Sequence, residues 1–344
     1  MMYPKWIIGL VVLVLAAASA CSRSPGAGPD AEESSSQGEQ MKFTNPVYDA
    51  NFPDPGVLKV DDTYYAYGTN DGVHNVPLLA SADLVHWKRK GDVLPSLGSW
   101  ATPGFTWAPE VLRTEAGGYV LYYTARSTDT ELQCVGAAVA DSPHGPFEDT
   151  SEGPLICQTD EGGSIDASPF LDSDGKVYLH WKNDGNSKGE ATHLYGQRLS
   201  DDGLELTGEP VRLLANRSET WHGHVIEAPQ MRAHDSKLYL FYSANAYDSD
   251  AYSVGYAQCD GPLGPCRDAQ ENPILSSGPG AAGPGHCSIV TGSDGESTWL
   301  LYHAWPPDAV GSDTPGRALW LDRIDWVDGK PFVDGPTDKE QPAP

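Results

Sequence analysis

The segment Ala108–Tyr123 reads APEVLRTEAGGYVLYY: a short apolar run, a polar turn with two glycines, and a run rich in tyrosine. Four other segments follow the same plan. They are DPGVL with YYAY (Asp54–Tyr67), DASPFL with VYLHW (Asp166–Trp181), EAPQM with LYLFY (Glu227–Tyr242) and HCSIV with TWLLY (His286–Tyr302). Because the apolar runs are short and turn-forming residues join them, each pair of runs predicts a β-hairpin.

The repeat is regular along the chain. Its opening polar residues, Asp54, Glu110, Asp166, Glu227 and His286, are separated by 56, 56, 61 and 59 residues. A third strand is expected in each unit, at residues 77–80, 135–140, 193–199, 252–258 and 318–324, with a fourth strand beyond it. Units of this length, built from strands and turns alone, are typical of propeller blades. The five units fill residues 43–336 and predict an all-β fold, a five-bladed β-propeller.

In a propeller the first strand of every blade lines the central channel. The five opening residues are therefore expected to occupy equivalent positions and to converge at one end of the axis. Four of them are acidic. A group of acidic side chains brought together in this way indicates an active site more often than a structural feature.

Composition limits the partners of the chain. It has 344 residues, 39% of them hydrophobic, which is enough for one large all-β domain or two ordinary ones. Acidic residues outnumber basic residues 48 to 22, which gives a net charge of −26. Such a surface repels nucleic-acid phosphates and anionic lipids, so we expect no nucleic-acid partner. The 10 Trp and 16 Tyr suit stacking on sugar rings and a β-sheet core equally well. We expect a monomer.

The N-terminus has the pattern of an export signal. Lys5 precedes an apolar run over residues 6–18, and the run ends in LAAASAC at Cys21, which resembles a bacterial lipobox. We therefore expect a lipoprotein-type signal peptide over residues 1–20, lipidation at Cys21, a flexible tether over 21–41 and the catalytic propeller over 42–344. The protein would then be exported and lipid-anchored in the cell envelope. The alternative is an ordinary signal peptide and a secreted protein.

Five cysteines follow the N-terminal segment. Cys259 and Cys266 flank a GPLGP turn, and Cys134 and Cys157 bracket a second hairpin-like stretch. Because export permits disulfides, we expect both pairs to be bonded, which leaves Cys287 as a buried free thiol. None of the spacings is that of a zinc site.

Several motifs, in this order, resemble those of glycoside hydrolase family 43, which contains arabinanases, arabinofuranosidases and xylosidases. They are NFPDPG (51–56), WAPE (107–110), SIDASPF (164–170), VIEAP (225–229), GHCS (285–288) and Arg317 before ALWLD. The resemblance covers nearly all of the chain after the N-terminal segment. It implies a five-bladed propeller that hydrolyses glycosidic bonds in one inverting step without a required cofactor. The implied substrates are plant-type polysaccharides or oligosaccharides with α-L-arabinofuranosyl or β-D-xylosyl linkages.

The resemblance also assigns roles to the acids. Asp54 would be the general base, Glu227 the general acid, and Asp166 the residue that orients the acid and raises its pKa by charge repulsion. Arg317 matches the family's late active-site arginine and would bind a substrate hydroxyl. Each acid also has a structural interpretation: Asp54 and Asp166 are common turn residues. Their combination at matching repeat positions favours the catalytic one.

The remaining candidates have less specific assignments. Glu110 is expected either to contact substrate or to make a structural hydrogen bond. Trp107, Trp221 and Trp305 are expected to stack against sugar rings. His286 is expected in the channel, either near a structural Ca²⁺, as in some family members, or as a hydrogen-bonded histidine without a metal.

Two other functions are alternatives for this sequence. A catalytically inactive sugar-binding propeller would lack one of the three acids, and all three are present. A retaining fructan hydrolase on a related propeller carries Arg-Asp-Pro and Glu-Cys motifs, whereas here Ile165 precedes Asp166 and Ala228 follows Glu227. The loops at the channel mouth decide which sugar is bound and whether cleavage is endo or exo, and their sequence does not predict either property.

Overall fold

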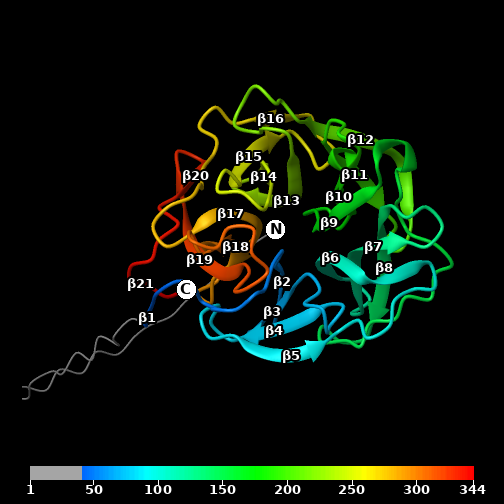
Figure 1. Ribbon diagram of the computed structural model, residues 1–344, viewed down its shortest axis with the longest axis horizontal. Helices are drawn as coiled ribbons and strands as arrows, with labels where there is room; N and C mark the ends of the chain where they lie inside the picture. Colours follow the sequence, from blue (N-terminus) through cyan, green and yellow to red (C-terminus); the bar gives the residue numbers. More distant parts are fainter. Residues whose placement is uncertain (1–40) are drawn as a thin grey trace, which may run out of the picture. The chain divides into compact units, whose positions relative to one another are not determined.

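The computed structural model describes residues 41–344, and these form five β-sheets around a central axis and one further two-stranded sheet (Figure 1). The predicted signal peptide, lipidation at Cys21 and nearly all of the predicted tether lie outside the described residues. Within residues 41–344, no helix is both long and apolar enough to cross a membrane.

Each of the five sheets around the axis is one blade, and its strands are antiparallel neighbours in chain order. Blade 1 contains β2 (Gly56–Val60), β3 (Thr63–Tyr67), β4 (Pro77–Ser81) and β5 (Lys88–Asp92). Blade 2 contains β6 (Ala101–Arg113), β7 (Tyr119–Ser127) and β8 (Gln133–Ala140). Blade 3 contains β9 (Ser164–Leu171), β10 (Val177–Asn183), β11 (His193–Leu199) and β12 (Leu206–Ala215).

Blade 4 contains β13 (Ile226–His234), β14 (Lys237–Ala244), β15 (Ser253–Cys259) and β16 (Cys266–Asp268). Blade 5 contains β17 (Ala282–Thr291), β18 (Thr298–Trp305), β19 (Ala318–Val327) and β20 (Lys330–Val333). Two short 3₁₀ helices, η1 (Thr159–Glu161) and η2 (Gly185–Lys188), lie in the loops of blade 3. The inner strands β2, β6, β9, β13 and β17 contact one another in sequence and return from β17 to β2. The predicted five-bladed propeller is confirmed.

Blade 2 differs from the prediction of four strands per unit. Its sheet has three strands, and the chain beyond β8 makes only isolated bridges, such as Val139 with Glu148. The segment after β8 contains several prolines and glycines, which interrupt a continuous ladder.

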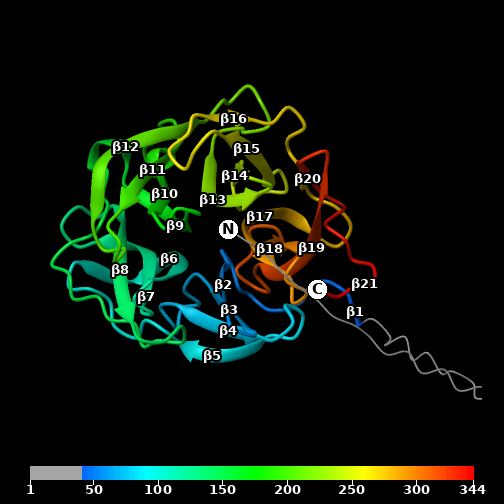
Figure 2. The same cartoon turned by 180° about the vertical axis from the view of Figure 1, so that it is seen from behind.

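The first and last described residues meet at blade 5. Strand β1 (Lys42–Phe43) pairs with β21 (Gln341–Pro342), and the two lie side by side in Figure 2. The Asn45 side chain adds a second link: its amide donates to the Leu321 carbonyl at 2.8 Å and accepts from the Leu321 N–H at 2.8 Å. The ring is thus held closed by residues from both ends of the domain.

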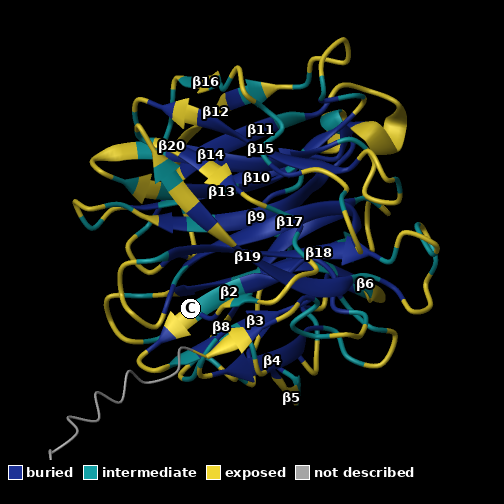
Figure 3. Cartoon of the chain, turned by 90° about the vertical axis from the view of Figure 1, so that its left-hand side faces the viewer, coloured by how far each residue is buried: buried dark blue, intermediate teal, exposed yellow. Residues whose placement is uncertain are grey.

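The core lies between neighbouring blades, because each apolar cluster combines residues of two adjacent blades. Most inner strands are buried (dark blue in Figure 3), whereas outer strands such as β5 and β12 are largely exposed. Tyr123, Tyr242 and Tyr302 are fully buried, and each donates a 2.6 Å hydrogen bond to an aspartate of its own blade. The apolar clusters therefore fix how adjacent blades pack, and these polar links brace blades 2, 4 and 5 internally.

The inner strands share one irregular residue, and it corrects the predicted alignment of the repeat. Left-handed φ angles occur at Asp54 (56°), Ala108 (44°), Asp166 (58°), Ala228 (53°) and His286 (47°). These five positions are equivalent, so the predicted equivalence of Glu110 and Glu227 with Asp54 is wrong. Glu227 lies one residue before its blade's irregular position, and Glu110 lies two residues after its own. Register shifts near these residues explain the offset, because a β-bulge redirects the side chains around it.

Both predicted disulfides are present. Cys134 in β8 is bonded to Cys157, and Cys259 in β15 is bonded to Cys266 at the adjacent edge strand. Cys287 is a buried free cysteine, as expected.

Candidate active site

A cavity of about 360 Å³ receives side chains from all five blades. The residues that line it are Asp54, Thr69, Trp107, Ile165, Asp166, Lys182, Asp184, Asn186, Ser187, Glu227, Tyr247, His286 and Arg317. The structure thus brings Asp54, Asp166 and Glu227 together, although 173 residues separate the first from the last in the chain. Trp107, His286 and Arg317 also lie where the sequence predicts site residues.

Asp54 is held as a carboxylate. Its Oδ1 accepts from Arg317 at 2.8 Å, and its Oδ2 accepts from the Thr69 hydroxyl at 2.6 Å. Burial alone would raise the pKa of Asp54, but the positive charge of Arg317 outweighs burial and holds the pKa well below its usual range. An ionised carboxylate in a cavity is suited to deprotonating a water molecule.

His303 supports Asp54 from β18 and was not found by sequence reasoning. The Asp54 N–H donates to His303 Nδ1 at 3.1 Å. Burial, together with the nearby Arg317 charge, lowers the pKa of His303 to about 3, so the ring is neutral and can accept this bond. Arg317 is therefore the cation that keeps Asp54 ionised, and His303 fixes its backbone. His286 Nδ1 lies 3.5 Å from Asp54 Oδ1.

Glu227 lies between two donors that sequence reasoning also missed. The Tyr252 hydroxyl donates to Oε1 at 2.8 Å, and the Lys182 ammonium donates to Oε2 at 3.2 Å. Burial and the nearby carboxylates raise the pKa of Tyr252 well above its usual value, so its hydroxyl remains a donor. The carboxyl group of Glu227 is thereby fixed in orientation from both sides.

Asp166 holds its proton more strongly than an ordinary aspartate. Burial raises its pKa to about 6, and the charges of Glu227 and Asp54 act in the same direction. Its Oδ2 accepts from the Ala228 N–H at 3.0 Å, next to Glu227 in the chain. Two acids of one cavity, Asp54 and Asp166, thus have pKa values displaced in opposite directions, which is a common feature of acid–base sites.

The aromatic candidates separate into three places. Trp107 lines the cavity. Trp305 lines an adjoining cavity of about 480 Å³, which shares Thr69, Tyr247 and Arg317 with the first. Trp221 lines neither cavity. Its ring packs against His222 and Tyr242, so packing alone accounts for it.

Glu110 lies outside the cavity, two residues further along its inner strand than Ala108. It accepts a 3.1 Å hydrogen bond from the Ser168 hydroxyl, and burial raises its pKa to about 8. Of the two expectations for Glu110, the structure shows the structural hydrogen bond. The Ca²⁺ considered near His286 remains a prediction: in residues 41–344 no group of three or more His, Cys, Asp or Glu side chains could hold a metal ion.

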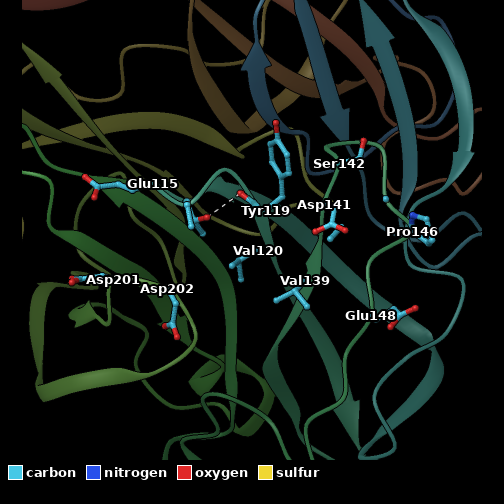
Figure 4. A pocket seen from close by; sticks show the side chains of 15 residues that line it. Glu115, Tyr119, Val120, Val139, Asp141, Ser142, Pro146, Glu148, Asp201 and Asp202 are labelled. Carbon is cyan, nitrogen blue, oxygen red and sulfur yellow. Dashed lines mark hydrogen bonds between the residues drawn. The ribbon is translucent and has the colours of Figure 1, made fainter.

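A larger cavity of about 1040 Å³ lies elsewhere, along the β6–β7 turn, β8 and the loop at residues 201–202 (Figure 4). Acidic side chains, including Glu115, Asp141 and Asp202, surround its floor of Tyr119, Val120 and Val139. It contains no histidine, arginine or lysine and none of the three predicted catalytic acids. The smaller cavity is therefore the candidate active site.

Comparisons with known proteins agree with this choice. The model of glycosyl hydrolases family 43 matches residues 43–331. The β-D-galactofuranosidase xynD of Aspergillus niger is 27% identical over 276 residues, 76% of each chain. The extracellular endo-α-(1→5)-L-arabinanase 2 of Bacillus subtilis is 23% identical over 365 residues, 85% of this chain and 75% of the relative.

The crystal structure of a thermostable family-43 glycoside hydrolase has the same fold. It superposes with a TM-score of 0.80 at 35% identity and covers 88% of this chain and 99% of its own. The family match spans all five blades, including every residue of the cavity. The chain therefore belongs to glycosyl hydrolase family 43 and is a glycoside hydrolase.

Proposed function

We propose that this protein is an exported, inverting glycoside hydrolase that cleaves α-L-arabinofuranosyl linkages in plant-type polysaccharides or oligosaccharides. The observation that carries the proposal is that the acids of the cavity lie in different environments. Asp54 is held ionised by Arg317, while Glu227 lies between two donors beside Asp166, whose pKa is raised to about 6. One site thus offers a base and a separately oriented acid.

In the proposed reaction Asp54 takes a proton from a water molecule as that water attacks the anomeric carbon. Glu227 donates its proton to the glycosidic oxygen as the bond between that oxygen and the anomeric carbon breaks. The proton balance is complete, because one carboxyl gains a proton and the other loses one. The water approaches the face opposite the leaving group, so the anomeric configuration inverts. Asp166 transfers no proton in this reaction. It positions Glu227 by accepting a hydrogen bond from the N–H of Ala228, the next residue in the chain.

The names of the related proteins support a furanoside substrate. One relative is named a β-D-galactofuranosidase, which refers to a five-membered sugar ring. Another is named an α-(1→5)-L-arabinanase, and an arabinose unit linked through O5 cannot close a six-membered ring. β-D-Xylosides are the second choice. The arabinanase is also named extracellular, which fits export. A cavity of about 360 Å³ with Trp107 on its wall is suited to a sugar ring stacked on an aromatic face.

The test is Glu227→Gln, assayed on nitrophenyl α-L-arabinofuranoside, nitrophenyl β-D-xyloside and debranched arabinan. We expect kcat to fall by about 10²- to 10⁴-fold, the usual contribution of a general acid. The loss should be greater on arabinan, whose alcohol leaving group needs more protonation than nitrophenolate does. Glu219→Gln, at an exposed position in the loop between β12 and β13, is the control. Unchanged turnover by Glu227→Gln would refute the assignment, and sugar binding without turnover by the wild type would identify a binding protein.

A further inference from the structure

Lys182 is a fully buried lysine at the wall of the cavity, and neither the motifs nor the family match assigns it a role. It lies in β10, the second strand of blade 3, paired with Ile165 directly before Asp166. Its side chain has 0% exposure, which is rare for lysine unless its charge is compensated. Such a residue needs an explanation beyond packing.

The repeat shows how unusual the residue is. In the other blades the corresponding side chains are Thr69, two residues after β3, and Thr124, Ser243 and His303 in the second strands β7, β14 and β18. Each of these side chains accepts a hydrogen bond from the N–H of the irregular inner-strand residue in the following blade. The N–H donors are Ala108, Asp166, His286 and Asp54, at 2.8–3.3 Å. Four of the five blades are thus joined to the next by the same bond.

Lysine has no acceptor, so blade 3 cannot make this bond to the Ala228 N–H. Asp166 Oδ2 takes it instead, at 3.0 Å. The ammonium of Lys182 is free to enter the cavity, where it donates to Glu227 Oε2 at 3.2 Å and to Asn186 Oδ1 at 2.6 Å. The presence of lysine at this one position therefore determines the hydrogen-bond partners of both the Asp166 and the Glu227 carboxyl groups.

The ammonium is charged in this setting. Burial lowers the pKa of Lys182, but the surrounding carboxylates outweigh burial and raise the pKa above its usual value. These carboxylates belong to Glu227, Asp166 and Asp184. The Lys182 and Arg317 side chains together offset the negative charge of the cavity, Arg317 at the base and Lys182 at the acid.

We propose that Lys182 is a positioning residue that orients the Glu227 carboxyl and sets the upper pH limit of activity. The inference rests on the proposed function, in which Glu227 must carry a proton. An ammonium beside a carboxyl favours its ionised form, so it sets the pH at which the acid is lost. The ionisable groups that share the cavity with Glu227 are Asp54, Asp166, Lys182, Asp184, Tyr247, His286 and Arg317, and Tyr252 contacts it through a hydrogen bond.

Two variants distinguish the effect of the Lys182 charge on activity from an effect on folding. Lys182→Thr supplies the hydroxyl that other blades use, so the Ala228 N–H keeps an acceptor and we expect a melting temperature near that of the wild type. Lys182→Met keeps most of the side-chain volume and removes the charge. Lys176→Thr, an exposed lysine on the β9–β10 hairpin, is the matched control.

In both Lys182 variants we expect kcat on nitrophenyl α-L-arabinofuranoside to fall by about 10- to 100-fold, as for a misplaced catalytic group. The basic limb of the kcat/KM profile should also move up by roughly one pH unit or more. A folded Lys182→Thr protein with wild-type kcat and an unchanged pH profile would show that Lys182 is only structural, and would overturn the proposal.

A second measurement does not depend on turnover. The carboxyl ¹³C signal of Glu227, assigned by its loss in Glu227→Gln, should titrate at higher pH in Lys182→Met than in the wild type. This result would support the charge contact even if the wild type hydrolysed none of the glycosides above, which would refute the proposed function alone. An identical titration in both proteins would refute the role of Lys182.

Discussion

Arg317 determines how Asp54 can act. The guanidinium contacts the carboxylate at 2.8 Å and is itself flanked by the rings of Tyr247 and Trp305, at 4.8 and 5.6 Å from their centroids. These aromatic faces hold the guanidinium in place and favour its charge. The low pKa of Asp54 is thus a property of the contact between blades 1 and 5.

Arg317→Met should raise the pKa of Asp54, because burial would then act with less opposition. The base would be protonated at a higher pH, so the acid limb of the kcat/KM profile should move upward while the basic limb stays in place. The pH profile on nitrophenyl α-L-arabinofuranoside measures this. An acid limb that does not move would show that Arg317 does not control the base.

Sequence reasoning identified Asp54, Asp166, Glu227 and Arg317 because each lies in a contiguous motif. Lys182, Tyr252 and His303 were not predicted as site residues. Lys182 and His303 lie in second strands whose pattern is that of an ordinary buried strand, and Tyr252 lies in the loop before β15. One signal was present: the run VYLHWKN places a lysine in a strand that is otherwise mostly apolar or aromatic. Charged residues in such a run need a partner, and here the partner is the general acid candidate.

At the scale of the strand, the irregular residue of each inner strand decides which side chains face the cavity. The hairpins and the third strands could be predicted from the apolar pattern of the sequence. The one- and two-residue offsets of Glu227 and Glu110 could not, because a bulge changes register without changing the residue types around it. Glu110 consequently lies away from the cavity, with Ser168 as its hydrogen-bond donor.

The buried position of Glu110 predicts that the folded protein loses stability at alkaline pH. The pKa of Glu110 is raised to about 8 in the folded protein, above its value in the unfolded chain, so its ionisation costs stability as pH rises from about 4.5 through 8. Glu110→Gln cannot ionise. At pH 9 it should be more stable than the wild type by about 4 kcal/mol, with little difference at pH 5.

Urea unfolding of Glu110→Gln at the two pH values provides the measurement, and the exposed Glu115→Gln provides the control. An equal effect of Glu110→Gln at both pH values would contradict the assignment of a buried, proton-bearing carboxyl.

At the scale of the molecule, the cavity exists only while the ring is closed, because its residues come from every blade. Closure joins the first described residues to the last through β1, β21 and Asn45. The number of blades could be predicted from the repeat. The closing contacts could not, since two-residue strands at the chain ends carry no periodic signal.

Asn45→Ala should destabilise the protein by about 1–3 kcal/mol, because it leaves the buried Leu321 N–H without its side-chain acceptor. It also removes one of the two side-chain donors to the Leu321 C=O, the other being Gln341. Urea unfolding measures the loss, with the exposed Asp49→Ala as control. A loss no greater than that of the control would mean that Asn45 does not hold the ring closed.

The central claim is that Asp54 and Glu227 hydrolyse the glycosidic bond in a single displacement. A ¹H NMR time course of nitrophenyl α-L-arabinofuranoside hydrolysis tests it most directly, since the first sugar released reveals the stereochemistry before mutarotation. The account predicts that β-L-arabinofuranose appears first and the α anomer only later. Initial release of the α anomer would contradict it.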